Sequence, residues 1–318
     1  MQVGDLDTAT LERELAGEGI ALDLGAARVR VRAQVPGFAE ALRTVYWAYP
    51  AEEPSGFFDI TVRIDRPRGI RRFVSPQVRF FVDGEWPFEP FPSDTHLPLL
   101  EWGINHCFAA RCHDHLVLHA GVVERRGHAV VLPALPGSGK STLTAALVCR
   151  GYRLLSDEFG VLRLSADMAV PMLKPLALKN ESIDVIHAFA PGVVLGPRFP
   201  KTRKGMVAHM APDAASVARR RTSARPSLIV FPKYTANTEL QCIPVPRSRA
   251  FTRLAVNSFN YAKLGPQGFD AVGDLVESCE CYSLRYSSLD EAVETVDELI
   301  EIVSEDDFTA PRREVLNR

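Results

Sequence analysis

Cysteine is scarce in this sequence, with six residues in a chain of 318. A disulfide scaffold uses cysteines densely in a short secreted chain, so this low number predicts reduced thiols in a cytosol. No continuous apolar run approaches the roughly 18 residues that cross a bilayer. The segment Met1–Asp5 lacks the basic start and apolar stretch of a signal peptide. The sequence therefore predicts a cytoplasmic protein with no membrane partner.

An excess of charge of one sign is also missing. The 37 lysines and arginines nearly balance the 39 aspartates and glutamates, which leaves a net charge of −2. Without an overall positive field to hold a phosphate backbone, the chain is not expected to bind nucleic acid. The 46% of hydrophobic residues suffices for a folded core, so wholesale disorder is excluded.

The length indicates two domains at roughly 150 residues each, or one large α/β domain with an added lobe. Residues 29–35 alternate apolar and basic side chains as a half-exposed strand does, and residues 78–82 are another expected strand. A helix is expected from residue 97 to about residue 111. We therefore expect an N-terminal α/β lobe over residues 1–92 and a second domain over residues 93–318.

From residue 116 the pattern turns to nearly continuous strands. Residues 116–124 and 129–132 flank the turn pair Arg126-Gly127, which predicts a β-hairpin. An apolar helix is expected from Lys140 to about Cys149, ended by Gly151. Further expected elements are strands at residues 153–156, 160–164 and 228–231 and an acidic amphipathic helix at residues 289–303.

The segment between the hairpin and the helix, residues 134–141, reads Ala-Leu-Pro-Gly-Ser-Gly-Lys-Ser. It matches the P-loop spacing G-x-x-x-x-G-K-[ST], with Ala134 at the position of the first glycine. Glycines permit torsions that turn successive N–H groups toward a phosphate, and the helix N-terminus adds partial positive charge. Because the segment follows a strand and opens a helix, we expect a nucleotide-binding loop rather than a chance glycine-rich turn. The residues expected to bind the nucleotide are Pro136, Gly137, Ser138, Gly139, Lys140, Ser141 and Thr142.

Two of these residues have more specific expected roles. Lys140 would reach the β- and γ-phosphates, and the Ser141 hydroxyl would bind Mg²⁺. An acidic pair, Asp157-Glu158, follows the next expected strand. Active groups gather at the carboxyl ends of strands in α/β sheets, where such a pair can hold Mg²⁺ and accept the proton of an attacking hydroxyl. A solvated turn beside Gly160 would carry the same residues, but the upstream loop favours a functional pair.

These motifs resemble those of the HPr kinase/phosphorylase superfamily, and the resemblance covers roughly residues 78–300. Its branch called HPr-related kinase A is the most similar. The residues that carry the resemblance are His119 on the strand before the loop, the loop itself, and the segments 150–158, 174–181, 231–234 and 257–261.

The resemblance implies an α/β fold with a P-loop kinase core of the HPr kinase/phosphoenolpyruvate carboxykinase type. In that type, helices flank a mixed sheet, and here a smaller N-terminal α/β lobe would precede it. The resemblance also implies that Asp157 activates the acceptor hydroxyl, that Glu158 lies near metal and lysine, and that His119 lies close to the transferred phosphate. From the residues alone, His119 would be a strand histidine satisfied by backbone hydrogen bonds.

Other polar residues have two readings each. Lys233 follows an apolar strand end, from which a cation can touch the γ-phosphate, but it is equally a turn lysine after Pro232. The basic stretch at residues 198–225 is interpreted as a solvated loop, with a lid over ATP as the alternative.

The cysteines and histidines at residues 106–115 lack the paired half-sites of zinc centres, so no cysteine metal site is expected there.

Together these residues predict an ATP-dependent kinase that uses ATP and Mg²⁺ and transfers the γ-phosphate to a hydroxyl. The acceptor would be a Ser or Thr of a small protein or peptide, as in the superfamily, or a small molecule. The resemblance also points to a homo-oligomer. The expected catalytic residues are Asp157, His119, Lys140 and Lys233, and the expected metal ligands are Ser141, Asp157 and Glu158.

Two other functions would use the same loop. One is a nucleotide-binding switch that is not a kinase, or a slow ATPase. The other is a ring ATPase that takes an arginine finger from a neighbouring copy. The arginines that could serve as that finger are Arg219, Arg220, Arg221 and Arg225.

Overall fold

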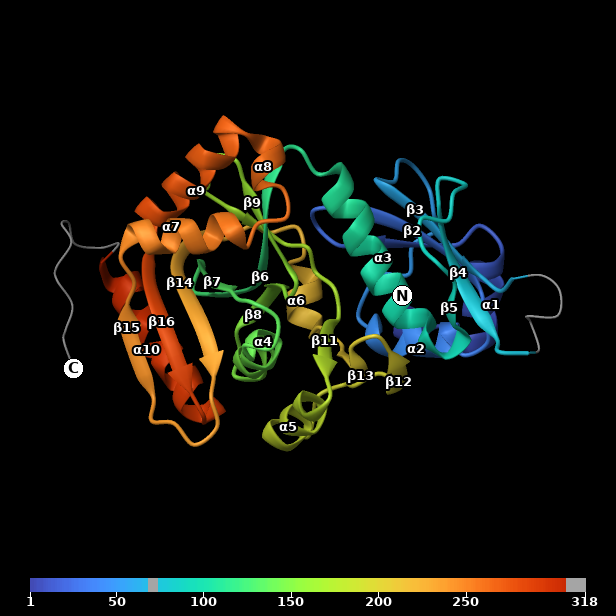
Figure 1. The fold of residues 1–318 in the computed structure, drawn as a ribbon. Coiled ribbons are helices and arrows are strands. Elements are labelled where there is room, and N and C mark those ends of the chain that lie inside the picture. The colour runs from blue at the N-terminus through green and yellow to red at the C-terminus, as the bar shows by residue number, and fades with distance from the viewer. Residues whose placement is uncertain (68–73, 307–318) are drawn as a thin grey trace.

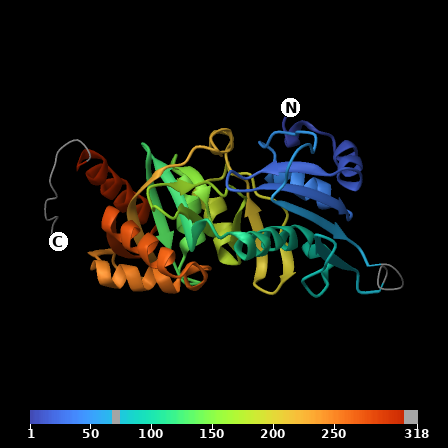
Figure 2. The ribbon, with the colours of Figure 1, turned by 90° about the horizontal axis from the view of Figure 1, so that it is seen from above.

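A computed structural model describes residues 1–67 and 74–306 of the protein, except for the side chains of Lys201 and Asp306. The fold is mixed α/β and contains a five-stranded, an eight-stranded and a three-stranded sheet (Figure 1). The mixed α/β class predicted from the sequence is therefore confirmed at this level. Figure 2 shows the N-terminal elements at one end of the molecule and the C-terminal helices at the other.

The first sheet has the order β1-β2-β3-β4-β5, in which only β2 and β3 run parallel. Every second residue of β2 is buried, as the alternation of residues 29–35 predicts. The helices α1 and α3 pack against this sheet, α1 on β2 and α3 on β3 and β4. The strands of this sheet and the helices around it are η1 (Val3–Asp5), α1 (Thr8–Ala16), β1 (Ile20–Asp23), β2 (Arg28–Gln34), α2 (Phe38–Val45), β3 (Ile60–Asp65), β4 (Gln77–Val82), β5 (Phe91–Pro92), η3 (Ser93–Thr95) and α3 (His96–Arg111).

The eight-stranded sheet has the order β10-β9-β6-β7-β14-β16-β15, and β8 also pairs with β6. The predicted hairpin is confirmed, because β6 and β7 pair antiparallel around Arg126 and Gly127, whose φ angles are 56° and 88°. The strands β7, β14 and β16 run parallel to one another. The strands of this sheet are β6 (His115–Arg125), β7 (His128–Pro133), β8 (Arg153–Ser156), β9 (Phe159–Arg163), β10 (Ala169–Val170), β14 (Arg225–Tyr234), β15 (Gln241–Pro244) and β16 (Glu280–Tyr286).

Helices cover both faces of this sheet. Along β7, Val130 and Leu132 join the apolar core shared with the helices α4 and α10, whereas Ala129 and Val131 join the core shared with α7 and α9. This burial on both faces explains why β7 is apolar at every position from 129 to 132. The helices are α4 (Lys140–Cys149), α7 (Arg247–Val256), α8 (Tyr261–Leu264), α9 (Pro266–Ser278) and α10 (Leu289–Asp306).

The basic stretch at residues 198–225 is not the solvated loop that the sequence suggested. It contains two strands of the three-stranded sheet, whose order is β11-β13-β12, and a short helix. Several of its arginines form ion pairs within the chain: Arg219 contacts Glu124, whereas Arg220 and Arg221 both contact Asp23. The elements of this region are β11 (Leu176–Lys179), α5 (Glu181–Phe189), β12 (Phe199–Thr202), β13 (Gly205–Met210) and α6 (Ala214–Ala218).

The joint between the first sheet and the rest of the chain is closely packed. Gly25 lies at this joint with φ of 93°, and a Cβ there would lie 2.3 Å from the carbonyl oxygen of Arg220. Across the same joint, Tyr49 donates its hydroxyl to the carbonyl oxygen of Leu173 at 2.9 Å. The predicted boundary after residue 92 lies before α3, although α3 packs on the first sheet. The division of the chain into two domains stays a prediction. Among the described helices, none has the length and apolarity needed to cross a membrane.

Candidate functional site

The connection between β7 and α4 is a tight turn, which we call the glycine loop (residues 134–141). Gly137 and Gly139 have φ angles of 85° and 88°, a region that L-residues with a side chain rarely adopt. A Cβ on Gly139 would lie 2.7 Å from the hydroxyl of Tyr286 and 2.9 Å from Cβ of Tyr234. The backbone N–H of Tyr234 donates to the carbonyl of Ser138 at 2.8 Å. The ends of β14 and β16 therefore fix the shape of the loop.

Lys140 begins α4 and forms a buried ion pair with Asp157. Its Nζ lies 3.1 Å from Oδ1 of Asp157 and also donates to the carbonyl oxygen of that residue. Both residues are less than a tenth exposed. The second carboxylate oxygen, Oδ2, is buried and accepts no hydrogen bond from the residues that the structure describes. A buried carboxylate oxygen without a partner is costly, so this atom is available for a ligand.

Glu158 lies beside Asp157 in the connection between β8 and β9 and faces several cations. Asn105 of α3 donates its amide to Oε2 at 2.5 Å, and Nζ of Lys179 lies 3.7 Å from Oε1. Burial alone would raise the pKa of Glu158. The surrounding lysines outweigh it and lower the pKa to about 2, so the carboxylate is charged at neutral pH. The lysines that lower it are Lys179, Lys174, Lys140 and Lys204.

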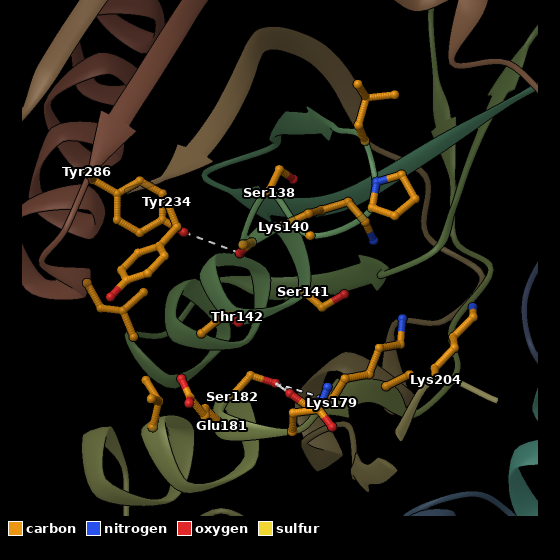
Figure 3. Close-up of a pocket in the computed structure, with 18 of the residues that line it drawn as sticks. Ser138, Lys140, Ser141, Thr142, Lys179, Glu181, Ser182, Lys204, Tyr234 and Tyr286 are labelled. Atoms are coloured by element: carbon orange, nitrogen blue, oxygen red, sulfur yellow. Dashed lines mark hydrogen bonds between the residues drawn. The ribbon is translucent and has the colours of Figure 1, made fainter. Parts of the chain in front are cut away.

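The glycine loop and Glu158 open onto a cavity of about 870 Å³ (Figure 3). This volume lies within the roughly 300–1,000 Å³ of sites for small molecules and cofactors. The sequence-predicted residues that line it are His119, Pro136, Gly137, Ser138, Gly139, Lys140, Ser141, Thr142 and Glu158. The other lining residues come from the loop, the segments around β11 and α5, the β12–β13 turn, and the ends of β14 and β16: Leu135, Ala177, Lys179, Asn180, Glu181, Ser182, Val185, Ala188, Phe189, Lys204, Tyr234, Tyr286, Ser287 and Leu289.

Two predicted catalytic residues are not among the described residues that line the cavity. Asp157 lies behind the cavity wall, where it contacts Lys140. Lys233 is exposed on β14, next to Tyr234, which does line the cavity. Because successive side chains of a strand point to opposite faces, Lys233 points away from the face that Tyr234 presents. Its predicted contact with a γ-phosphate stays a prediction.

His119 occupies the wall of the cavity on β6. Burial is the main cause that lowers its pKa below 6.5, and the Lys140 ammonium lowers it further, while Glu158 and Asp157 oppose the shift. The imidazole is therefore neutral at neutral pH. Its ring packs edge-on against Phe259, with centroids 5.8 Å apart, and its backbone N–H donates to Asn257.

Several residues of the site were not predicted from the sequence. Asn105 lies in a helix that also buries the polar residues His96 and Glu101, so nothing local distinguishes it. Lys204 lies in the basic stretch that suggested a solvated loop. Tyr234 and Tyr286 end two parallel strands beside the glycine loop. Their signal was present but weak, since an aromatic residue at a strand end is common without a functional role.

A second group of donor atoms lies elsewhere. One donor atom each of Cys112, Asp114 and His115 lies within 4.8 Å of the others. Burial and, after it, the Asp114 carboxylate raise the pKa of the Cys112 thiol to about 11.

Comparisons with known proteins give a distant structural likeness. No family model matches the chain, and no curated protein matches it in sequence. Among solved structures, the HPr(Ser) kinase/phosphatase from Coxiella burnetii matches 60% of this chain and 94% of its own chain, at 12% identity and a TM-score of 0.21. A likeness of that size does not establish a shared fold. Membership of the superfamily named above therefore stays a prediction.

Proposed function

We propose that this protein is an ATP-dependent phosphotransferase that transfers the γ-phosphate of ATP to a hydroxyl. The observation that carries the proposal is the buried pair of Lys140 and Asp157 behind a glycine loop that opens a helix and lines a cavity. A loop of this kind suits a polyphosphate, because its N–H groups and the helix N-terminus attract negative charge. The Asp157 carboxylate, which contacts Lys140 of this loop, suits a proton acceptor.

Three hard oxygen ligands fit Mg²⁺. The Ser141 hydroxyl and the charged Glu158 carboxylate line the cavity, and the unpartnered Oδ2 of Asp157 lies behind its wall. We propose that these three residues hold the metal. A bound Mg²⁺ would neutralise charge on the β- and γ-phosphates.

In the proposed reaction, phosphates in the glycine loop compete with Asp157 for the Lys140 ammonium. Asp157, released from this ion pair, accepts the proton of the acceptor hydroxyl. A bond then forms between the acceptor oxygen and the γ-phosphorus, and the bond from that phosphorus to the β,γ-bridging oxygen breaks, which releases ADP. Lys140 offsets the charge that develops on the phosphoryl oxygens. The acceptor is proposed to be a Ser or Thr of a small protein or peptide, or a small molecule.

The same site supports a second candidate, a nucleotide-binding switch or slow ATPase. The supporting observation is that Asp157 lies behind the cavity wall and is already paired with Lys140. If that pair persists when nucleotide is bound, the carboxylate receives no proton from an acceptor and the chain only binds nucleotide.

Phosphate transfer from ATP labelled at the γ-position separates the two candidates. The purified chain with Mg²⁺ is added to an extract of the cells that make it, beside the variants Lys140→Ala and Asp157→Asn. The exposed residues Lys263 and Asp270 supply matched controls as Lys263→Ala and Asp270→Asn. The kinase proposal expects a labelled acceptor that is absent with both site variants and present with both controls, while Asp157→Asn still binds ADP. Nucleotide binding without any labelled acceptor, unaffected by Asp157→Asn, would support the switch instead.

A further inference from the structure

Three parallel strands end beside the glycine loop. The loop follows β7, Tyr234 ends β14, and Tyr286 ends β16, and the two tyrosines are paired neighbours in the sheet register. In open α/β sheets, ligands bind outside the carboxyl ends of parallel strands. The cavity therefore extends from the loop along the ends of β14 and β16.

The two ends of this cavity differ in chemistry. Figure 3 shows Tyr234 and Tyr286 on one side of the α4 N-terminus and Lys179 and Lys204 on the other. The lysine side also holds Glu158, so it suits phosphates and metal. Glu181 lines the cavity at the first turn of α5. The lining residues of the tyrosine side beyond this turn carry no charged group, and we call them the uncharged end: Val185, Ala188, Phe189, Tyr234, Tyr286, Ser287 and Leu289.

The helix α5 supplies the wall opposite Tyr234. Val185, Ala188 and Phe189 have the i, i+3, i+4 spacing that places side chains on one face of a helix, and all three line the cavity. A chain of contacts connects this face to the start of α10. The guanidinium of Arg150 lies 4.4 Å from the ring centroid of Phe189 and 2.5 Å from Asp290, which follows Leu289.

Apolar surface is left open at this end. Tyr234 is 51% exposed and Val185 is 43% exposed, although both line a cavity rather than a convex surface. Tyr286 has a different role, because it is 1% exposed and donates its hydroxyl to the carbonyl of Gly139 at 3.2 Å. The Ser287 hydroxyl is also engaged, by the carbonyl of Thr238. Tyr234 therefore presents an aromatic face that a ligand can reach.

We propose that the uncharged end binds the nucleobase of the nucleotide, which stacks on the ring of Tyr234 opposite the apolar face of α5. This inference rests on the proposed function and adds the base to the phosphate site. A nucleotide whose phosphates lie in the glycine loop places its base on one side of the loop and its γ-phosphate on the other. Only the uncharged end suits a flat, uncharged aromatic ring, because the opposite end holds lysines and a carboxylate.

An apolar part of the acceptor is the other ligand that this end could hold. The acceptor hydroxyl has to reach the γ-phosphate, beside Lys140, Asp157 and Glu158, which lie toward the lysine side. An acceptor bound at the uncharged end would have to pass the α- and β-phosphates first. The base has no such obstacle, so the geometry favours the base.

Calorimetric titration with two ligands tests the inference. ADP carries the base, whereas inorganic tripolyphosphate carries phosphates alone, and both are titrated with Mg²⁺ into the full chain and its variants. Stacking of a base on an aromatic side chain stabilises binding by about 1–3 kcal/mol, so Tyr234→Ala is expected to weaken ADP binding by about tenfold. Its affinity for tripolyphosphate is expected to be unchanged, and Tyr234→Phe is expected to bind both ligands like the wild type.

The other possible results of these titrations also decide whether the base binds at the uncharged end. Wild-type affinity for ADP in Tyr234→Ala would overturn the inference and would leave an apolar part of the acceptor as the ligand of this end. Equal weakening of both ligands would also overturn it, because Tyr234 would then act only on the loop. Lys140→Ala distinguishes the two proposals, since loss of tripolyphosphate binding in that variant supports the phosphate site whatever Tyr234 does. A wild-type chain that binds neither ligand would overturn the proposed function and this inference with it.

Discussion

The side-chain amide of Asn105 donates to Oε2 of Glu158 across 2.5 Å, although 53 residues separate them in the chain. Asn105 belongs to α3, which packs on the first sheet, and Glu158 belongs to the cavity wall. Because the amide occupies one carboxylate oxygen, Oε1 is the oxygen left near Lys179. The first sheet thus contributes, through α3, a residue that orients an acid of the candidate site.

Replacing Asn105 tests this orientation. Asn105→Leu leaves a partly buried carboxylate oxygen without its donor, which costs about 1 kcal/mol or more. Asn105→Asp replaces the donor by a second carboxylate, which cannot donate to Oε2 and repels it from its present position. Both variants are expected to raise the Mg²⁺ concentration needed for half-maximal ADP binding by about fivefold or more. A merely structural role would lower the free energy of unfolding without moving the Mg²⁺ dependence. The exposed amide of Gln267 supplies the control Gln267→Glu.

The glycine loop offers a matched pair of substitutions. Gly137 and Gly139 have nearly equal φ angles, so alanine at either position costs about 1–2 kcal/mol in backbone strain. Only Gly139 is also crowded, because a Cβ there meets Tyr286 and Tyr234 at less than 3 Å, whereas nothing lies within 4 Å of a Cβ on Gly137. Gly139→Ala is therefore expected to lower the free energy of unfolding more than Gly137→Ala. Urea unfolding of both variants measures the difference, and equal losses would show that the tyrosines give way.

The local parts of this site could be predicted from the sequence, and the parts that depend on tertiary contacts could not. The glycine loop and the helix at residues 140–149 are encoded by neighbouring residues, and the structure has that helix at the predicted bounds. The third sheet was missed because β12 and β13 lie in a segment whose lysines and arginines suggest a solvated loop. Asn105 and Tyr286 join the site only through contacts with residues 53 and 147 positions away, which periodicity does not reveal.

The attraction between Lys179 and Glu158 makes the free energy of unfolding depend on pH. The pKa of Glu158 is lowered to about 2, so this carboxylate stabilises the folded state above its ordinary pKa of 4.5, and the contribution is lost as the pH falls toward 2. Lys179→Gln removes the largest of the attractions that lower this pKa. The variant is expected to be less stable than the wild type above pH 4.5, with the difference shrinking as the pH falls below that value. Urea unfolding at pH 3 to 7 measures it, with Lys263→Gln as the exposed control, and a pH-independent difference would contradict the assignment.

The last prediction concerns the buried pair of Glu101 and Lys174, which joins α3 to the segment before β11. Nζ of Lys174 lies 3.0 Å from Oε2 of Glu101, whose Oε1 accepts from the Tyr46 hydroxyl at 2.6 Å. Both side chains are a tenth exposed or less. Lys174→Met leaves the carboxylate buried and uncompensated, so the free energy of unfolding is expected to fall by about 3–5 kcal/mol. Glu101→Met with Lys174→Met removes both charges and is expected to recover most of that loss, because burying an ion pair carries its own desolvation penalty. If the double variant instead loses as much free energy of unfolding as the two single variants lose together, Glu101 and Lys174 are not coupled across this joint.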